Sequence, residues 1–186
     1  MKISRATSNR APIILLYAAE GRGKSTLACK FPKPLALLLE RGLPRGVEVD
    51  AVESADSFEA IMATLREIYM APGEYRSLLI DTVNALEALL IEGLCAKNNW
   101  KTIETASYGK GWVAADDEWR RFIRAITAIR DKHGMTIVMT CHCTIERIDL
   151  GRQPTRAISR GCTSVRVVWS WIAPTQSSSL PRTCAS

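Results

Sequence analysis

The chain has 186 residues, 47% of them hydrophobic, which suffices for one α/β domain whose core needs neither disulfides nor a metal. Its net charge of +6 does not by itself indicate a nucleic-acid partner, because residues 150–186 hold five arginines and no acidic residue. No apolar run approaches the roughly 18 residues that cross a bilayer, and the start lacks a signal-peptide apolar region, so we expect no membrane association and a cytoplasmic location.

The first half of the chain alternates between predicted strands and helices. Residues 1–11 are polar, and we expect them to be flexible. An apolar run at residues 12–17 predicts a fully buried parallel strand, which leads directly into a glycine-rich loop. A short helix is expected over residues 24–30. It ends there because Pro32 disfavours helical geometry in the residue before it. A second buried strand at residues 35–39 then ends at Glu40.

The next predicted elements follow a glycine- and proline-rich loop. Alternating valines predict a half-exposed strand at residues 47–52. Ser54 is placed to cap the amphipathic helix that runs to about Tyr69. A fourth, apolar strand at residues 78–80 delivers Asp81 at its carboxyl end.

Beyond Asp81, leucines at helical spacing predict another helix, followed by a flexible loop around residues 109–111. A long amphipathic helix ends near Gly134, and a fifth strand at residues 136–140 leads to His142. After Leu150 the chain shows no sustained helical or strand period. We therefore expect one domain over residues 12–149 and an irregular, poorly ordered tail over residues 150–186, in which residues 165–171 could still form one strand.

Alternation of strands and helices predicts an α/β fold with a mostly parallel, five-stranded sheet flanked by helices. Such sheets bind ligands at the carboxyl ends of their strands. Glu40, Asp81 and His142 all follow predicted strands at that edge. The sequence therefore places three polar side chains where a ligand site is expected.

The glycine-rich loop AAEGRGKST has the composition of a phosphate-binding P-loop. Gly21 and Gly23 allow backbone N–H groups to approach phosphate closely, Lys24 can reach the β and γ phosphates, and the Ser25 hydroxyl can bind Mg²⁺. The strand before the loop and the helix after it are the context that this motif requires. The predicted nucleotide-binding segment comprises Ala18, Ala19, Glu20, Gly21, Arg22, Gly23, Lys24, Ser25 and Thr26.

Ala18 departs from the P-loop pattern, whose first position is normally glycine. If that position needs a positive φ, alanine there costs on the order of 1 kcal/mol. A glycine-rich turn without a ligand explains Gly21 and Gly23 but gives no reason for Lys24 and Ser25.

Asp81, at the end of an apolar strand, matches the Walker B role of supporting Mg²⁺. The alternative is a helix cap formed by Asp81 or Thr82. Many ATPases place a catalytic glutamate directly after this aspartate, but here that position is Thr82. Glu40 is therefore the candidate base for the attacking water. An exposed loop glutamate is the alternative.

His142 is a candidate for contacting the γ-phosphate or the attacking water, although a lone histidine is often only structural. Around the flexible loop, Tyr108, Lys110 and Trp112 combine two aromatic rings with a cation, which suits stacking on nucleic-acid bases. A solvated loop explains these three residues nearly as well. Arginines 120, 121, 124 and 130 indicate a polar helix face, from which one could reach a neighbouring subunit's nucleotide.

The ordered set of the P-loop, PKPLALLLERG with Glu40, LLIDT with Asp81, YGKGW, and TCH with His142 resembles phage-encoded AAA-type, RecA-like ATPases associated with single-strand annealing and recombination. The resemblance implies a RecA-like core, ATP with Mg²⁺, single-stranded DNA as a partner, homo-oligomers, and a gene carried by a phage or prophage in a bacterial host. It also favours Glu40 as the base. The tail lacks the closing strands of such a core, so we hypothesise a shifted reading frame or a divergent end, which translation of the other two frames would test.

Three functions stay open at this point. The first is an ATPase that couples hydrolysis to handling of single-stranded DNA. The second is a small-molecule P-loop kinase, although no arginine-rich lid is found before residue 150. The third is a nucleotide-dependent DNA-binding or assembly protein that does not hydrolyse ATP.

Overall fold

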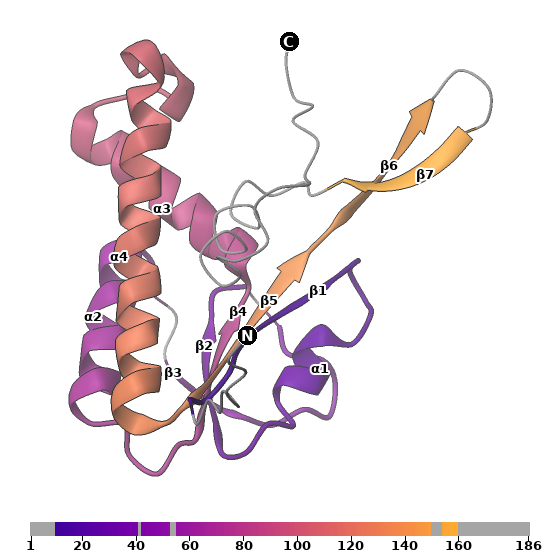
Figure 1. Ribbon diagram of the computed structural model, residues 1–186, viewed down its shortest axis with the longest axis vertical. Coiled ribbons are helices and arrows are strands. Elements are labelled where there is room, and N and C mark those ends of the chain that lie inside the picture. Colours follow the sequence, from indigo (N-terminus) through magenta and orange to yellow (C-terminus); the bar gives the residue numbers. More distant parts are fainter. Residues whose placement is uncertain (1–9, 41, 53–54, 150–153, 160–186) are drawn as a thin grey trace, which may run out of the picture.

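A computed structural model of the chain describes residues 10–40, 42–52, 55–149 and 154–159, with no side chain described for Tyr108 or beyond Cys143. Strands and helices alternate along most of this length (Figure 1). In chain order the elements are β1 Ile13–Ala18, α1 Lys24–Ala28, β2 Pro34–Leu38, β3 Asp50–Val52, α2 Phe58–Met70, β4 Ser77–Asp81, α3 Val83–Asn98, the 3-10 turns η1 Ile103–Thr105 and η2 Ser107–Gly109, α4 Lys110–His133, β5 Thr136–His142, β6 Thr144–Asp149 and β7 Pro154–Ser159.

The main sheet has five strands in the order β1-β5-β4-β2-β3, and every pair is parallel. This confirms the predicted α/β class and a RecA-like P-loop core. The strand that enters the P-loop and the strand that ends at Asp81 are not neighbours, because β5 lies between them. All five strands point the same way, so Ala18, Asp81 and His142 come to one edge of the sheet.

Helices cover both faces of the sheet: α1 lies on one side, and α2, α3 and α4 lie on the other (Figure 1). Side chains alternate between the faces along each strand. On β5, Ile137, Met139 and Cys141 face the large core under α2, α3 and α4, whereas Val138 packs in a small cluster with Ala28 of α1. The α1 face of the sheet is therefore thinly covered. Thr140 and His142, which follow Val138 at alternate positions of β5, lie on this face.

Three predictions for the first half of the chain need correction. β1 is half-buried rather than fully buried, because strand order places it at the edge of the sheet, where β5 is its described partner. The third strand is shorter than residues 47–52 and starts only at Asp50. The cap of α2 is Ser57, whose hydroxyl accepts from the Ala60 N–H at 3.2 Å; Ser54 lies outside the described residues.

The segment around residue 110 is helical, so the predicted flexible loop is wrong. Lys110 opens α4, which runs for 24 residues back past the sheet. A Cβ at Gly111 would lie 2.2 Å from the Ile103 carbonyl oxygen, so glycine serves close packing of η1 against α4 there. The end of α3, η1, η2 and the start of α4 form a helical protrusion that rises beyond the carboxyl end of β4 (Figure 1).

After His142 the chain continues into a two-stranded antiparallel sheet formed by β6 and β7. β7 occupies residues 154–159, so this part of the expected irregular tail forms a strand. Residues 165–171 lie outside the described part of the chain, as does most of the segment for which a shifted frame was hypothesised. Within the described ranges, no helix is long and apolar enough to cross a bilayer.

Candidate nucleotide-binding site

The loop between β1 and α1 adopts a backbone that depends on its glycines. Gly21 and Gly23 have φ angles of 71° and 78°, in the left-handed region that side chains other than hydrogen disfavour. Gly23 directly precedes α1, and its carbonyl oxygen accepts from the Leu27 N–H at 2.9 Å. The two turns bend the chain sharply around Lys24, as a phosphate-binding loop requires.

Ala18 does not carry the strain that a positive φ would impose. It is the last residue of β1, it pairs with His142 in the strand register, and it is absent from the described non-glycine residues with positive φ. Its carbonyl oxygen accepts from the Cys143 N–H at 3.2 Å. The condition for a cost of alanine at this position is therefore not met.

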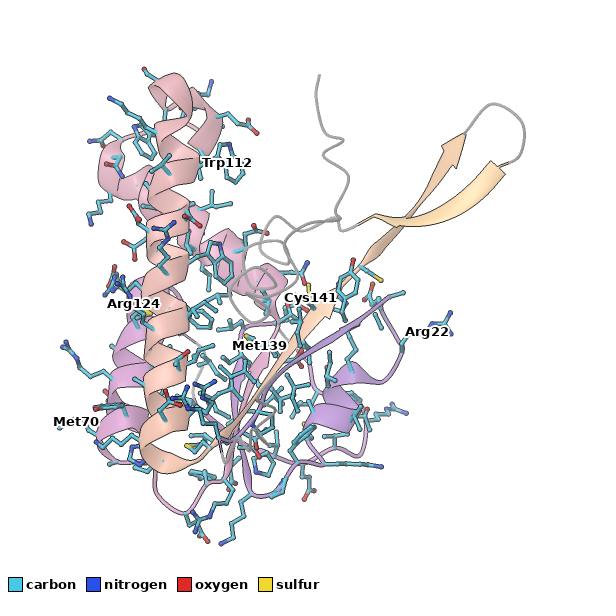
Figure 2. The ribbon with its side chains drawn as sticks, in the orientation of Figure 1. Arg22, Met70, Trp112, Arg124, Met139 and Cys141 are labelled. Atoms are coloured by element: carbon cyan, nitrogen blue, oxygen red, sulfur yellow. The ribbon has the colours of Figure 1, made fainter. Side chains whose placement is uncertain are left out.

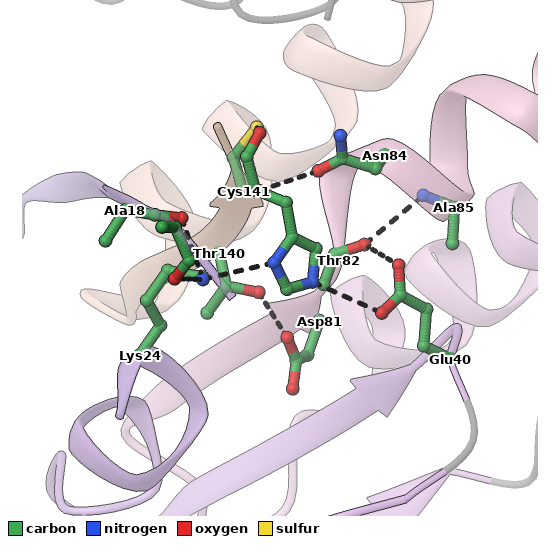
Figure 3. Close-up of polar contacts among 11 residues, drawn as sticks. Ala18, Lys24, Glu40, Asp81, Thr82, Asn84, Ala85, Thr140 and Cys141 are labelled. Atoms are coloured by element: carbon green, nitrogen blue, oxygen red, sulfur yellow. Dashed lines mark hydrogen bonds and ion pairs between the residues drawn. The ribbon is translucent and has the colours of Figure 1, made fainter. Parts of the chain in front are cut away.

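Lys24 is a buried cation whose partners are all neutral. Its side chain is 8% exposed, and Nζ lies 2.9 Å from the carbonyl oxygens of both Ala18 and Ala19 and 3.1 Å from Nδ1 of His142 (Figure 3). No ion pair joins Lys24 to a carboxylate of the described residues within 4.0 Å. The ammonium group is thus desolvated without a counter-charge, which is unfavourable unless an anion binds beside it.

The remaining loop residues lie around this lysine. Arg22 projects away from the body of the domain (Figure 2), and Glu20, two residues before it, is also exposed. Ser25 and Thr26 are half-buried on the first turn of α1. Of the nine predicted loop residues, Lys24 alone is buried.

Asp81 ends β4 and is almost fully buried, at 7% exposed. Its Oδ1 accepts a hydrogen bond from the hydroxyl of Thr140 on the neighbouring strand β5 (Figure 3). Asp81 makes no helix cap: the residue that caps α3 is Thr82, whose Oγ1 accepts from the Ala85 N–H at 3.3 Å. The helix cap therefore belongs to Thr82, and the support of Mg²⁺ by Asp81 stays a prediction.

The negative charge of Asp81 affects the pKa of Cys29, the residue that follows α1. Burial raises the pKa of the Cys29 thiol, and the negative charge of Asp81 raises it further. Cys29 is one helical turn from Ser25, whose carbonyl oxygen accepts from the Cys29 N–H at 3.0 Å. Hydroxyl and carboxylate oxygens are the donors that Mg²⁺ prefers. The hydroxyl of Ser25 and the carboxylate of Asp81 therefore fit the ion in their donor chemistry.

Glu40 follows β2 and reaches across to the ends of two other strands. Its Oε1 accepts from Thr82 Oγ1 at 2.5 Å, and its Oε2 lies 3.4 Å from Nε2 of His142 (Figure 3). Its side chain is 43% exposed, so solvent can still approach the carboxylate. Glu40 is not an isolated loop glutamate, because both of its oxygens are engaged at the strand edge.

His142 connects the P-loop to Glu40. An ammonium group only donates, so Nδ1 accepts from Lys24, and the ring then carries its hydrogen on Nε2, toward Glu40. The backbone N–H of His142 donates to Oδ1 of Asn84 at 2.9 Å, which fixes the end of β5 against the start of α3. The structure therefore brings Lys24, Glu40, Asp81 and His142 into one site.

Sequence reasoning missed three residues of this site: Thr82 as a partner of Glu40, Asn84 and Thr140. The strand alternation held a signal for Thr140, since it lies between Val138 and His142 on the face of β5 that packs toward α1. Asn84 and Thr82 gave no such signal, because they lie outside the strands, at the start of α3.

The candidate nucleic-acid residues lie apart from this site, on the protrusion. Lys110 and Trp112 are in the first turn of α4, and Trp112 is 40% exposed at its tip (Figure 2). The side chain of Tyr108 lies outside the described part of the chain. On the same helix, Arg120 pairs with Asp116 at 2.6 Å and Arg121 with Glu59 at 2.9 Å, as a polar helix face would.

Comparison with known families decides which kind of P-loop protein this is. Residues 10–167 match a family model described as an AAA domain. The chain belongs to the AAA domain family. The match spans the P-loop, Glu40, Asp81 and His142. A search of curated proteins found no match to the chain.

Membership in the AAA domain family indicates a nucleotide-binding ATPase of the P-loop type. In this AAA domain the sheet order places β5, with its terminal histidine, between the P-loop strand and the Asp81 strand.

Proposed function

We propose that this AAA domain binds ATP with Mg²⁺ and hydrolyses it, with Glu40 as the general base. The observation that carries the proposal is Lys24, a buried ammonium group with only neutral partners at the mouth of a glycine loop. A triphosphate would supply the missing negative charge, and the loop amides would donate to its oxygens. No other buried cation among the described residues lies at the carboxyl edge of the sheet.

The polar residues around Lys24 divide the remaining chemistry. Lys24 would exchange the carbonyl oxygens of Ala18 and Ala19 for phosphate oxygens. Ser25 and Asp81 would hold Mg²⁺, which supplies charge neutralisation and orientation of the phosphates. Glu40 would accept the proton of the attacking water on Oε2, the oxygen that faces His142 and is not held by Thr82.

His142 is placed to respond to the γ-phosphate because it contacts both Lys24 and Glu40. When Lys24 turns to phosphate, Nδ1 of His142 loses its donor and becomes available to another hydrogen-bond partner. The Nε2–H can then orient the carboxylate of Glu40 or a water beside it. This arrangement links occupancy of the P-loop to the position of the base.

A second part of the proposal is that the hydrolysis cycle serves single-stranded DNA binding and annealing during phage recombination, in a homo-oligomer. The support is the resemblance of the ordered motifs, together with Lys110 and Trp112 exposed on the protrusion. An exposed tryptophan suits base stacking, and a lysine in the same helical turn can contact a phosphate. Trp112 lies on the protrusion, well apart from Arg22 of the P-loop, so DNA and nucleotide would not compete for one surface (Figure 2).

The test is an ATPase assay on purified full chain, with and without single-stranded DNA. Wild type should release phosphate, and DNA should increase the rate. Lys24→Ala should lose ATP binding, whereas Glu40→Gln should bind ATP and lose turnover. Trp112→Ala should keep the basal rate and lose the stimulation by DNA. Folded wild type that neither binds nor hydrolyses ATP would refute the first part, and phosphate transfer to a nucleoside or nucleotide acceptor would indicate a kinase instead.

A further inference from the structure

Thr140 is a fully buried hydroxyl residue in a strand whose other buried members are apolar or a thiol. Its exposed fraction is 0%, and β5 is paired on both sides, with β1 and with β4. A buried hydroxyl lowers stability unless it forms a hydrogen bond. A valine of the same shape would fill this position without that requirement, so the hydroxyl calls for an explanation.

The hydroxyl of Thr140 donates to Oδ1 of Asp81, the residue already assigned to Mg²⁺ (Figure 3). The strand register explains the contact: Ile80 pairs with Met139, so Asp81 and Thr140 are the next pair and point to the same face. β5 is an interior strand of the sheet, and Thr140 is stiff at χ1 because it is β-branched. The donor is therefore held rigidly.

A carboxylate that supports a metal must present one oxygen in a fixed direction. With Oδ1 occupied by Thr140, the Oδ2 of Asp81 accepts no hydrogen bond from the described residues and is the oxygen left for Mg²⁺ or one of its waters. Outer hydrogen bonds of this kind orient metal-binding carboxylates and raise metal affinity.

We propose that Thr140 is a positioning residue that fixes the Asp81 carboxylate for Mg²⁺, and this rests on the proposed function of Mg²⁺-ATP binding. The hydroxyl acts through Asp81 and does not touch the nucleotide. It follows that the hydroxyl matters for the magnesium-dependent part of nucleotide affinity and not for the part supplied by the P-loop and Lys24.

Two substitutions separate the hydroxyl from the shape of the side chain. Thr140→Val keeps the branched shape and removes the donor. Thr140→Ser keeps the donor and removes a methyl group. If the buried contact served only folding, both variants would shift the melting temperature while leaving the response of ATP affinity to Mg²⁺ unchanged.

The experiment is calorimetric titration of ATP into wild type, Thr140→Val and Thr140→Ser, in Mg²⁺ and in EDTA. Loss of one hydrogen bond to a charged group is expected to reduce the affinity gain from Mg²⁺ by about tenfold or more in Thr140→Val. Thr140→Ser should keep most of the gain, and all three proteins should bind ATP alike in EDTA. Should Thr140→Val not fold, Thr140→Cys, which has a poor donor of similar size, replaces it with the same expectation.

An unchanged gain from Mg²⁺ in folded Thr140→Val would overturn the assignment of Thr140 while leaving ATP binding intact. Equal losses of affinity in Mg²⁺ and in EDTA would overturn it as well, since they would indicate general damage to the site. Wild type that binds no ATP in either condition is a different result, because it refutes the proposed function and with it the basis of this inference.

Discussion

Replacing Lys24 with methionine should separate the contribution of this side chain to folding from its contribution to ligand binding. Taking an ammonium group out of water costs several kcal/mol, and each hydrogen bond that it donates returns about 1.5–3 kcal/mol. With hydrogen bonds to the carbonyls of Ala18 and Ala19 and to His142, and no carboxylate paired with Lys24 in the described part of the chain, these terms nearly cancel. Methionine keeps the buried stem and avoids the desolvation.

The unfolding free energy of Lys24→Met should therefore equal that of wild type or exceed it by up to about 2 kcal/mol in the absence of nucleotide. ATP affinity should fall by about 10- to 100-fold, the equivalent of one charged hydrogen bond to phosphate. Urea unfolding followed by tryptophan fluorescence measures the first quantity, and calorimetric titration measures the second.

The exposed Lys30 supplies the control, because Lys30→Met makes the same chemical change outside the site and should alter neither quantity appreciably. A loss of more than about 2 kcal/mol of stability in Lys24→Met would refute the reasoning, since it would show that the neutral partners more than offset the burial of the charge.

Three further predictions concern the surrounding structure. Gly23→Ala should lose about 1 kcal/mol of stability and weaken ATP binding, because φ is 78° at this position. Gly93 lies inside α3, and a Cβ there meets no close contact, so Gly93→Ala should gain up to about 1 kcal/mol in the same unfolding assay. Thr82→Ala should lose about 1 kcal/mol from the cap of α3 and lower kcat, while Thr82→Ser should keep both; equal kcat in the two variants would contradict the contact with Glu40. The Arg121 guanidinium lowers the pKa of Glu59 in the folded protein. This ion pair therefore stabilises the fold above the unfolded pKa of about 4.3, and the stabilisation disappears as pH falls through the lower folded pKa. Arg121→Gln should reduce stability slightly at pH 7 but not below that window, as measured by unfolding at a series of pH values.

The order of strands and helices could be predicted from the sequence because the signals are local. The apolar runs before Glu40 and Asp81 and the turn residues between them determine each element without knowledge of its neighbours. The same signals placed Glu40, Asp81 and His142 at strand ends, and the parallel sheet then brought them to one edge.

Properties that depend on neighbours could not be predicted. The half-buried state of β1 follows from its place at the edge of the sheet, which periodicity does not reveal. Thr82 gained its role as partner of Glu40 only when β2 came to lie beside β4. Gly109 and Gly111 suggested a flexible loop, but the missing side chain of Gly111 instead allows η1 to press against α4.

The start of α3 is tied to two residues of the site, through Thr82 at its N-cap and Asn84 in its first turn. Thr82 holds Glu40, and Asn84 holds the backbone of His142. The helix has 16 residues and spans about 24 Å, so a tilt of about 10° at its base swings its far end by about 4 Å. Because η1 packs closely against Gly111 of α4, such a tilt would also displace the start of α4, which carries Trp112.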